Sequence, residues 1–197
     1  MTDYEHLQKV VPNLIENEVL ELLTGDKGNV STNSTSMLGG GKHYNAAMKC
    51  KMLANQMNGS IMKQTGGSKV FGINFTAKMT LEVREWTNGM PSFDVKEKGD
   101  ELERYVFPTP FTIPSIPHRD ISMQSLEKDN GDFRMYQGVW RLQPLPGCSL
   151  QQGESAMRLA YAVEVSPRAY LPVALIEGYI ARDLAVNLEA IREVFIG

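Results

Sequence analysis

The chain has 197 residues, with 20 basic and 23 acidic side chains and a net charge of −3 at neutral pH. This length fits one domain with a substantial core. The balanced charge argues against nucleic acid as a partner and allows at most transient membrane contact.

The two cysteines and the hydropathy of the chain narrow the class of protein further. Cys50 and Cys148 have neither metal nor redox spacing, so we expect free thiols in a reducing compartment and no metal site. No apolar run approaches the roughly 20 residues that span a bilayer. The polar start MTDYEHLQK is neither a signal peptide nor a transit peptide, so we expect a soluble intracellular protein.

The N-terminal residues predict a helix, a strand and then a loop-rich stretch. Thr2, with Glu5 three positions later, is typical of a helix start, and we expect a helix over Thr2–Val11 and a strand over Val19–Leu23. Residues 24–59 are rich in Gly, Ser, Thr and Asn and predict a flexible insertion, within which HYNAAMKCKMLANQM could form a short helix. Its GGGK run lacks the Ser or Thr that a phosphate-binding loop needs after the lysine.

Alternating apolar and polar residues then predict about six antiparallel strands. The clearest alternation covers Ile73–Glu85, with one apolar and one wet face. Four prolines between Glu101 and Pro117 predict an irregular loop. The other expected elements are a hairpin over Ser60–Phe71 that turns at Gly66-Gly67, a strand over Ser92–Lys96 after the Asn88-Gly89 turn, a hairpin over Arg119–Glu127 and Asp132–Gln143, and a strand over Ser155–Val165.

A long amphipathic helix is predicted over Leu171–Phe195. At 100° per residue its apolar face collects Val173, Ile176, Ile180, Leu184, Leu188, Ile191, Val194 and Phe195. Two polar residues, Glu177 and Asn187, fall inside this face. Because a meander sheet curls as it twists, it can grip such a helix, which predicts an α+β fold.

Four blocks of the sequence resemble the START-like, helix-grip superfamily (SRPBCC), and most of all its polyketide cyclase/dehydrase and lipid-transport group, which includes coenzyme Q-binding proteins. The blocks are TDYEHLQKVVPNLIENEVLE, QTGGSKVFGINFTAKMTLEVRE, DFRMYQGVWRLQP and YLPVALIEGYIARDLAVNLEAIRE. The resemblance implies one domain over residues 1–197, interrupted by the insertion at 24–59, with a curved antiparallel sheet wrapped around the C-terminal helix.

The resemblance also exposes a difference at the N-terminus. Family members usually begin with a strand that leads into the first helix. In this chain Met1 stands in place of that strand. We therefore expect a truncated start, with which a chloroplast or mitochondrial targeting segment could have been lost. The alternative is an open edge on the Ser155–Val165 strand, which natural proteins usually avoid.

The resemblance implies an apolar ligand cavity between the concave sheet face and the last helix. Each residue that would line it fits core packing equally well, although eleven methionines offer an adaptable apolar surface. Glu177 either orients a polar head group or is stabilised by the helix start. The expected lining residues are Phe75, Met79, Leu81, Met123, Trp140, Met157, Tyr161, Ile176, Glu177, Ile180, Leu184 and Leu188.

No catalytic set stands out, since His6, His43 and His118 lie in separate segments and no nucleophile, metal triplet or carboxylate pair has a suitable spacing. We expect non-catalytic binding or transport of a lipid, quinone or isoprenoid, with no cofactor. A cyclase/dehydrase-type enzyme stays open, with Arg141 and Arg158 as polar candidates that strand alternation turns outward. A protein-interaction module such as a ribosome-associated factor stays open as well. The sequence indicates no oligomeric state.

Overall fold

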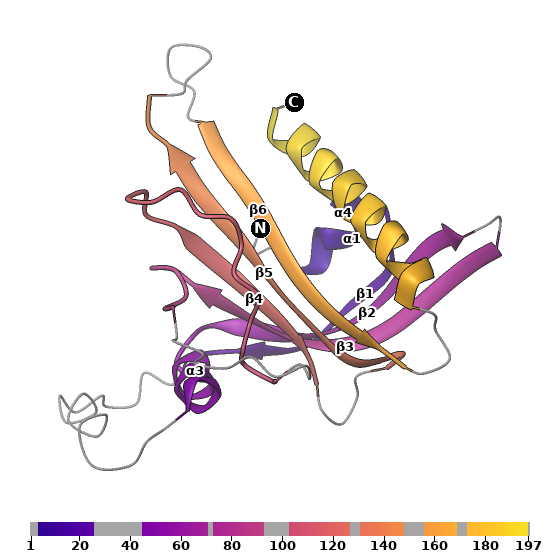
Figure 1. Ribbon diagram of the computed structural model, residues 1–197, viewed down its shortest axis with the longest axis horizontal. Helices are drawn as coiled ribbons and strands as arrows, with labels where there is room; N and C mark the ends of the chain where they lie inside the picture. Colours follow the sequence, from indigo (N-terminus) through magenta and orange to yellow (C-terminus); the bar gives the residue numbers. More distant parts are fainter. Residues whose placement is uncertain are drawn as a thin grey trace.

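The computed structural model describes residues 4–25, 45–70, 73–92, 103–126, 131–147, 156–168 and 173–196. Six strands form one antiparallel sheet in the order β1-β2-β3-β4-β5-β6, and the sheet curves around the side that carries α1 and α4 (Figure 1). The elements are η1 (Tyr4–His6), α1 (Leu7–Val10), β1 (Leu14–Leu23), α3 (Ala46–Ala54), β2 (Gly59–Val70), β3 (Ile73–Trp86), β4 (Arg119–Ser125), β5 (Phe133–Leu145), β6 (Ala156–Pro167) and α4 (Val173–Ile196). The predicted α+β helix-grip fold with six strands is confirmed.

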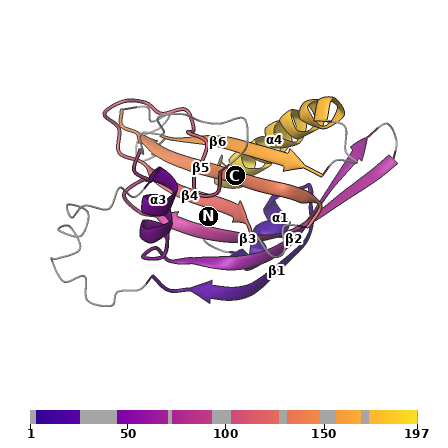
Figure 2. The same ribbon diagram turned by 60° about the horizontal axis from the view of Figure 1, so that its bottom comes forward.

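The two faces of the sheet carry different cores because alternate residues of β3 point to opposite sides. Leu81 and Val83 face the side that we call the inner face, where they pack with Tyr4 of η1 and Met62 of β2. Trp86 lies on the outer face and packs against Cys50 and Ala54 of α3. In Figure 2, α3 accordingly lies apart from α4, at the other end of the strands.

The C-terminal helix α4 lies over the inner face, where it contacts α1 and β2. Ile191 is its most buried described residue, at 5% exposure, and Ile180, Leu184 and Leu188 are half-buried. Val194, which the helical pattern placed on the apolar face, is 59% exposed. No helix in the described part of the chain is long and apolar enough to cross a membrane.

The hairpin predicted over Ser60–Phe71 is wrong. β2 continues as one strand through Gly66 and Gly67, because both glycines are paired on both sides: Gly66 lies opposite Leu14 and Ala77, and the Gly67 N–H donates to the Asn13 carbonyl at 2.8 Å. Ladder bonds to two neighbouring strands therefore outweigh the turn preference of the glycine pair.

Apart from the strand expected over Ser92–Lys96, the remaining expected elements match the structure with small shifts. β1 starts at Leu14, five residues before the predicted strand, and the chain forms its first helical turn at Tyr4. The stretch at 24–59, expected to be a flexible insertion, contains α3, whose Cys50 and Ala54 are only 1% exposed. Ser92 lies outside any strand, and Thr2 and the rest of the expected Ser92–Lys96 strand fall outside the described residues.

The proline-rich segment before β4 is irregular, as expected, and it lies against the outer face of the sheet. Its residues hydrogen-bond to polar side chains on the outer face of the sheet. The Tyr105 N–H donates to Gln124 Oε1 at 2.8 Å, and Gln137 Nε2 donates to the Val106 carbonyl at 2.7 Å. The outer face of β4 and β5, which alternation alone would leave in water, is therefore covered by this segment.

Candidate functional site

The candidate site is the inner face of the strands β3 to β6. Residues that lie opposite one another on adjacent strands form rows across the sheet. Successive side chains of a strand point to opposite faces, so every second row lies on the same face. One inner-face row contains Val83, Met123, Gly138 and Val163, and the next contains Glu85, Ile121, Trp140 and Tyr161. Most of this surface is apolar, and Met79, Ile121 and Met123 are only partly buried against its core.

An aromatic pair with a shared hydroxyl contact lies on β5 and β6. The rings of Trp140 and Tyr161 are stacked, with centroids 4.1 Å apart and planes 16° apart. The hydroxyl oxygens of Tyr136 and Tyr161 lie 2.5 Å apart in a hydrogen bond. Burial raises the pKa of both phenols, and for Tyr161 the hydroxyl of Tyr136 raises it further. Both therefore stay neutral hydroxyls at physiological pH.

A second polar contact lies at the β3 end of the row that runs from Glu85 to Tyr161. The Tyr4 hydroxyl of η1 donates to Glu85 Oε1. Burial is the main reason that the pKa of Tyr4 is raised, and the hydrogen bond and negative charge of Glu85 add to it. The inner face thus presents an apolar surface with a carboxylate and phenol at one end and two phenols at the other.

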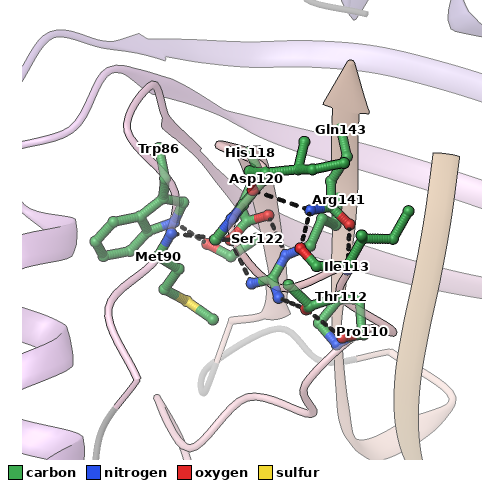
Figure 3. A network of polar contacts seen from close by, with 11 residues as sticks. Trp86, Met90, Pro110, Thr112, Ile113, His118, Asp120, Ser122, Arg141 and Gln143 are labelled. Carbon is green, nitrogen blue, oxygen red and sulfur yellow. Dashed lines mark hydrogen bonds and ion pairs between the residues drawn. The ribbon is translucent and has the colours of Figure 1, made fainter. Parts of the chain in front are cut away.

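The outer face holds Arg141 in a separate network (Figure 3). Arg141 donates to both carboxylate oxygens of Asp120, at 2.9 and 2.8 Å, and to the Thr112 hydroxyl. Arg158 is exposed on the same face, with its guanidinium 4.0 Å from the centre of the Phe111 ring. The prediction that both arginines turn away from the inner face is therefore confirmed.

Among the described residues, no three His, Cys, Asp or Glu side chains lie close enough to one another to hold a metal ion. The inner face instead offers hydroxyl, carboxylate and aromatic groups.

A family model described as polyketide cyclase/dehydrase and lipid transport matches residues 1–192, almost the whole chain. The chain belongs to this family. Comparison with curated proteins and with solved structures found no match. Membership of the polyketide cyclase/dehydrase and lipid-transport family implies a domain that binds an apolar small molecule or acts on a polyketide-like substrate, while the similarity to coenzyme Q-binding proteins stays a prediction.

The structure brings several of the predicted lining residues of this family member together. Met79, Leu81, Met123, Trp140 and Tyr161 share the inner face. Met157 lies on the same face of β6, toward the strand start, and is 47% exposed. Phe75 continues the same alternation on β3, but its side chain and those of Ile176 and Glu177 on α4 lie outside the described residues.

Three residues of the candidate site were missed by sequence reasoning. Tyr136 and Glu85 carry a detectable signal, because they share the strand alternation of Trp140 and Val83 respectively. Tyr4 carries none, because its contact with Glu85 joins residues 81 positions apart.

Proposed function

We propose that this polyketide cyclase/dehydrase and lipid-transport family member binds an apolar small molecule, such as a quinone, an isoprenoid or a lipid, against the inner face of the sheet. One observation carries the proposal: large apolar side chains of β4, β5 and β6 on this face are incompletely buried in the folded chain. Ile121, Met123 and Trp140 are half-buried and Met157 is exposed. A ligand in contact with them would remove this surface from water.

The polar groups of the inner face would orient such a ligand rather than supply its affinity. One of the Tyr136 and Tyr161 hydroxyls donates to the other, and the remaining O–H can donate to a carbonyl or hydroxyl oxygen of a ligand. The stacked Trp140 and Tyr161 rings lie beside it and present an aromatic surface. Three inter-strand spacings, about 14 Å, separate the Glu85 and Tyr161 positions. This span suits a ligand longer than a single ring.

Tryptophan fluorescence offers a direct test because the two tryptophans lie on opposite faces. We expect titration with a short-chain ubiquinone analogue, farnesol or oleate to change the emission of Trp140 in a saturable way. Trp140→Phe should abolish the change, and Trp86→Phe should preserve it, since Trp86 is buried on the outer face. Equal signals in the two variants would contradict binding at the inner face.

Native mass spectrometry of gently purified protein provides an independent readout. We expect an adduct that organic extraction removes, identified as one of the three ligand classes. A clean apo mass, together with no uptake of any of the three probes, would rule out the carrier function.

A second candidate is a cyclase or dehydrase acting on a polyketide-like substrate, and the placement of Glu85 favours it. Glu85 shares a face with the neutral Tyr136 and Tyr161 hydroxyls, so a carboxylate base and the one phenol O–H that the Tyr136–Tyr161 hydrogen bond leaves free would border the same substrate. Turnover of a poly-β-ketone thioester analogue that falls at least about a hundredfold in Glu85→Gln would support this reading. Binding of the analogue without turnover would support the carrier.

A further inference from the structure

A pocket lies on the outer face, separated from the candidate ligand site by the sheet. α3, residues 90–92, residues 105–109 and β5 enclose about 110 Å³. This is room for about three or four water molecules or one small organic molecule. Its walls include Cys50, Met90, Tyr105 and Phe107, and Arg141 is the charged residue among its lining residues. Burial raises the pKa of the Cys50 thiol to about 12, so the thiol stays protonated and acts as an apolar wall.

Arg141 enters this pocket with unused hydrogen-bonding capacity. Its side chain is 6% exposed, and a guanidinium carries five N–H donors. Nε and Nη2 donate to the two carboxylate oxygens of Asp120, and Nη1 donates to the Thr112 hydroxyl (Figure 3). One N–H on each terminal nitrogen is left without an acceptor among the described residues. A buried N–H without an acceptor is unfavourable, which points to a molecule that supplies one.

The charges around the pocket select the kind of acceptor. Asp120 neutralises Arg141, while Lys51 of α3 lies with its ammonium 5.7 Å from the centre of the Tyr105 ring, close to the pocket lining. The Tyr105 hydroxyl donates to Glu82 at 3.3 Å. Glu82 is paired with Arg84 at 2.7 Å, so Asp120 is the carboxylate next to the Arg141 donors, and it would repel a dianion more strongly than a singly charged group.

We propose that this pocket binds the carboxylate of a small organic acid, with its oxygens on the two unused Arg141 N–H groups and its short hydrocarbon part against Met90, Tyr105 and Phe107. The planar guanidinium fork matches the two oxygens of a carboxylate in a bidentate pair. Because the pocket is formed by α3 and the proline-rich segment, occupancy also ties these two outer-face segments to β5.

The test is a titration of the ¹⁵N-labelled full chain with sodium butyrate, followed through the Arg141 Nε–H resonance. We expect a saturable shift, with n-butanol binding at least about tenfold more weakly because it offers no charged acceptor. Sodium chloride at equal ionic strength should give no saturable shift. Inorganic phosphate that binds more tightly than butyrate would overturn the assignment to a carboxylate.

Variants that fill the pocket test whether butyrate binds inside it. Ala46 lines the pocket and Ala47, its neighbour on α3, does not, so Ala46→Phe should weaken butyrate binding at least about tenfold while Ala47→Phe leaves it unchanged. Ser92→Leu, which narrows the pocket from the other side, should act as Ala46→Phe does and serves if that variant unfolds. Butyrate binding that is unaffected by a folded filling variant would overturn the proposal.

Discussion

Tyr161 reaches Tyr136 by leaning over Gly138. In the strand register Tyr161 lies opposite Trp140, and Val165 lies opposite Tyr136, so the two tyrosines are not direct cross-strand neighbours. A Cβ atom added to Gly138 would lie 2.7 Å from the Tyr161 hydroxyl oxygen. The missing side chain therefore provides the space in which the two hydroxyls meet at 2.5 Å.

Replacing this glycine should separate the two tyrosines. We expect Gly138→Ala to lower the free energy of unfolding by about 1 kcal/mol, the usual net value of one hydrogen bond, because the Tyr161 ring has to move from its place. Urea denaturation measures the loss. Gly178→Ala is the control: it lies in the interior of α4 with no atom within 4 Å of an added Cβ, so it should stabilise the protein by up to about 1 kcal/mol. A Gly138→Ala variant as stable as the parent, with an unchanged ligand affinity, would contradict the role given to this space.

The raised tyrosine pKa values predict a loss of stability in alkaline solution. Tyr4, Tyr105, Tyr136 and Tyr161 all have pKa values above the ordinary value, with burial as the largest cause. Above about pH 10 the unfolded chain releases these protons while the folded chain keeps them. The contribution of the neutral, buried phenols to the free energy of unfolding is therefore complete below about pH 10. It is lost as the pH rises toward the pKa values of the folded state.

Unfolding in urea at about pH 9 and about pH 11 would measure this effect. The free energy of unfolding should fall less between these two pH values in the double variant Tyr136→Phe/Tyr161→Phe, because two of the four phenols then no longer titrate. An alkaline slope that is identical in the parent and the double variant would show that the inner-face tyrosines ionise normally.

The buried Asp120–Arg141 pair should tolerate the loss of neither partner. Asp120 is 1% and Arg141 5% exposed, and Asp120 also accepts the Met90 N–H at 2.8 Å. We expect Asp120→Ala to cost about 3–5 kcal/mol, because it leaves a guanidinium charge buried without its partner. Arg158→Ala removes an exposed arginine on the neighbouring strand and should cost less than about 1 kcal/mol. Thermal denaturation of both variants provides the comparison. Similar losses of stability in the two variants would contradict the idea that the burial of the Asp120–Arg141 pair makes the loss of Asp120 costly.

The sequence predicted features that depend on local pattern and missed those that depend on distant contacts. The alternation over Ile73–Glu85 places the inner-face residues correctly because one apolar face determines the register of a strand. The same rule turned Arg141 outward, but nothing local indicated that the segment at 103–118 would cover it or that Thr112 of this segment would accept one of its hydrogen bonds. Gly66-Gly67 was assigned to a turn because strand pairing on both sides cannot be read from the pair itself. Whether the residues predicted on α4 contact a ligand stays a prediction.

The contact between Tyr4 and Glu85 should hold η1 against the inner face. Tyr4→Phe leaves the Glu85 carboxylate without this donor on a mostly apolar surface, and we expect a loss of about 1.5–3 kcal/mol, the range for hydrogen bonds to charged groups. Tyr105→Phe is the matched control. Its hydroxyl meets Glu82 at the longer distance of 3.3 Å on the outer face, so its loss should be below about 1.5 kcal/mol.

A double-mutant cycle with Glu85→Gln separates this contact from the packing of the ring. If the hydrogen bond carries the effect, Tyr4→Phe should cost much less in the Glu85→Gln background than in the parent. Hydrogen exchange should then report faster opening of residues 4–10 in the single variant Tyr4→Phe, while β4 and β5 keep their protection. Equal costs in both backgrounds would assign the anchoring of η1 to the packing of Tyr4 against Met62 and Leu81. In that case the Glu85 carboxylate would contribute little to the stability of η1, and it would be a stronger candidate for direct contact with the ligand.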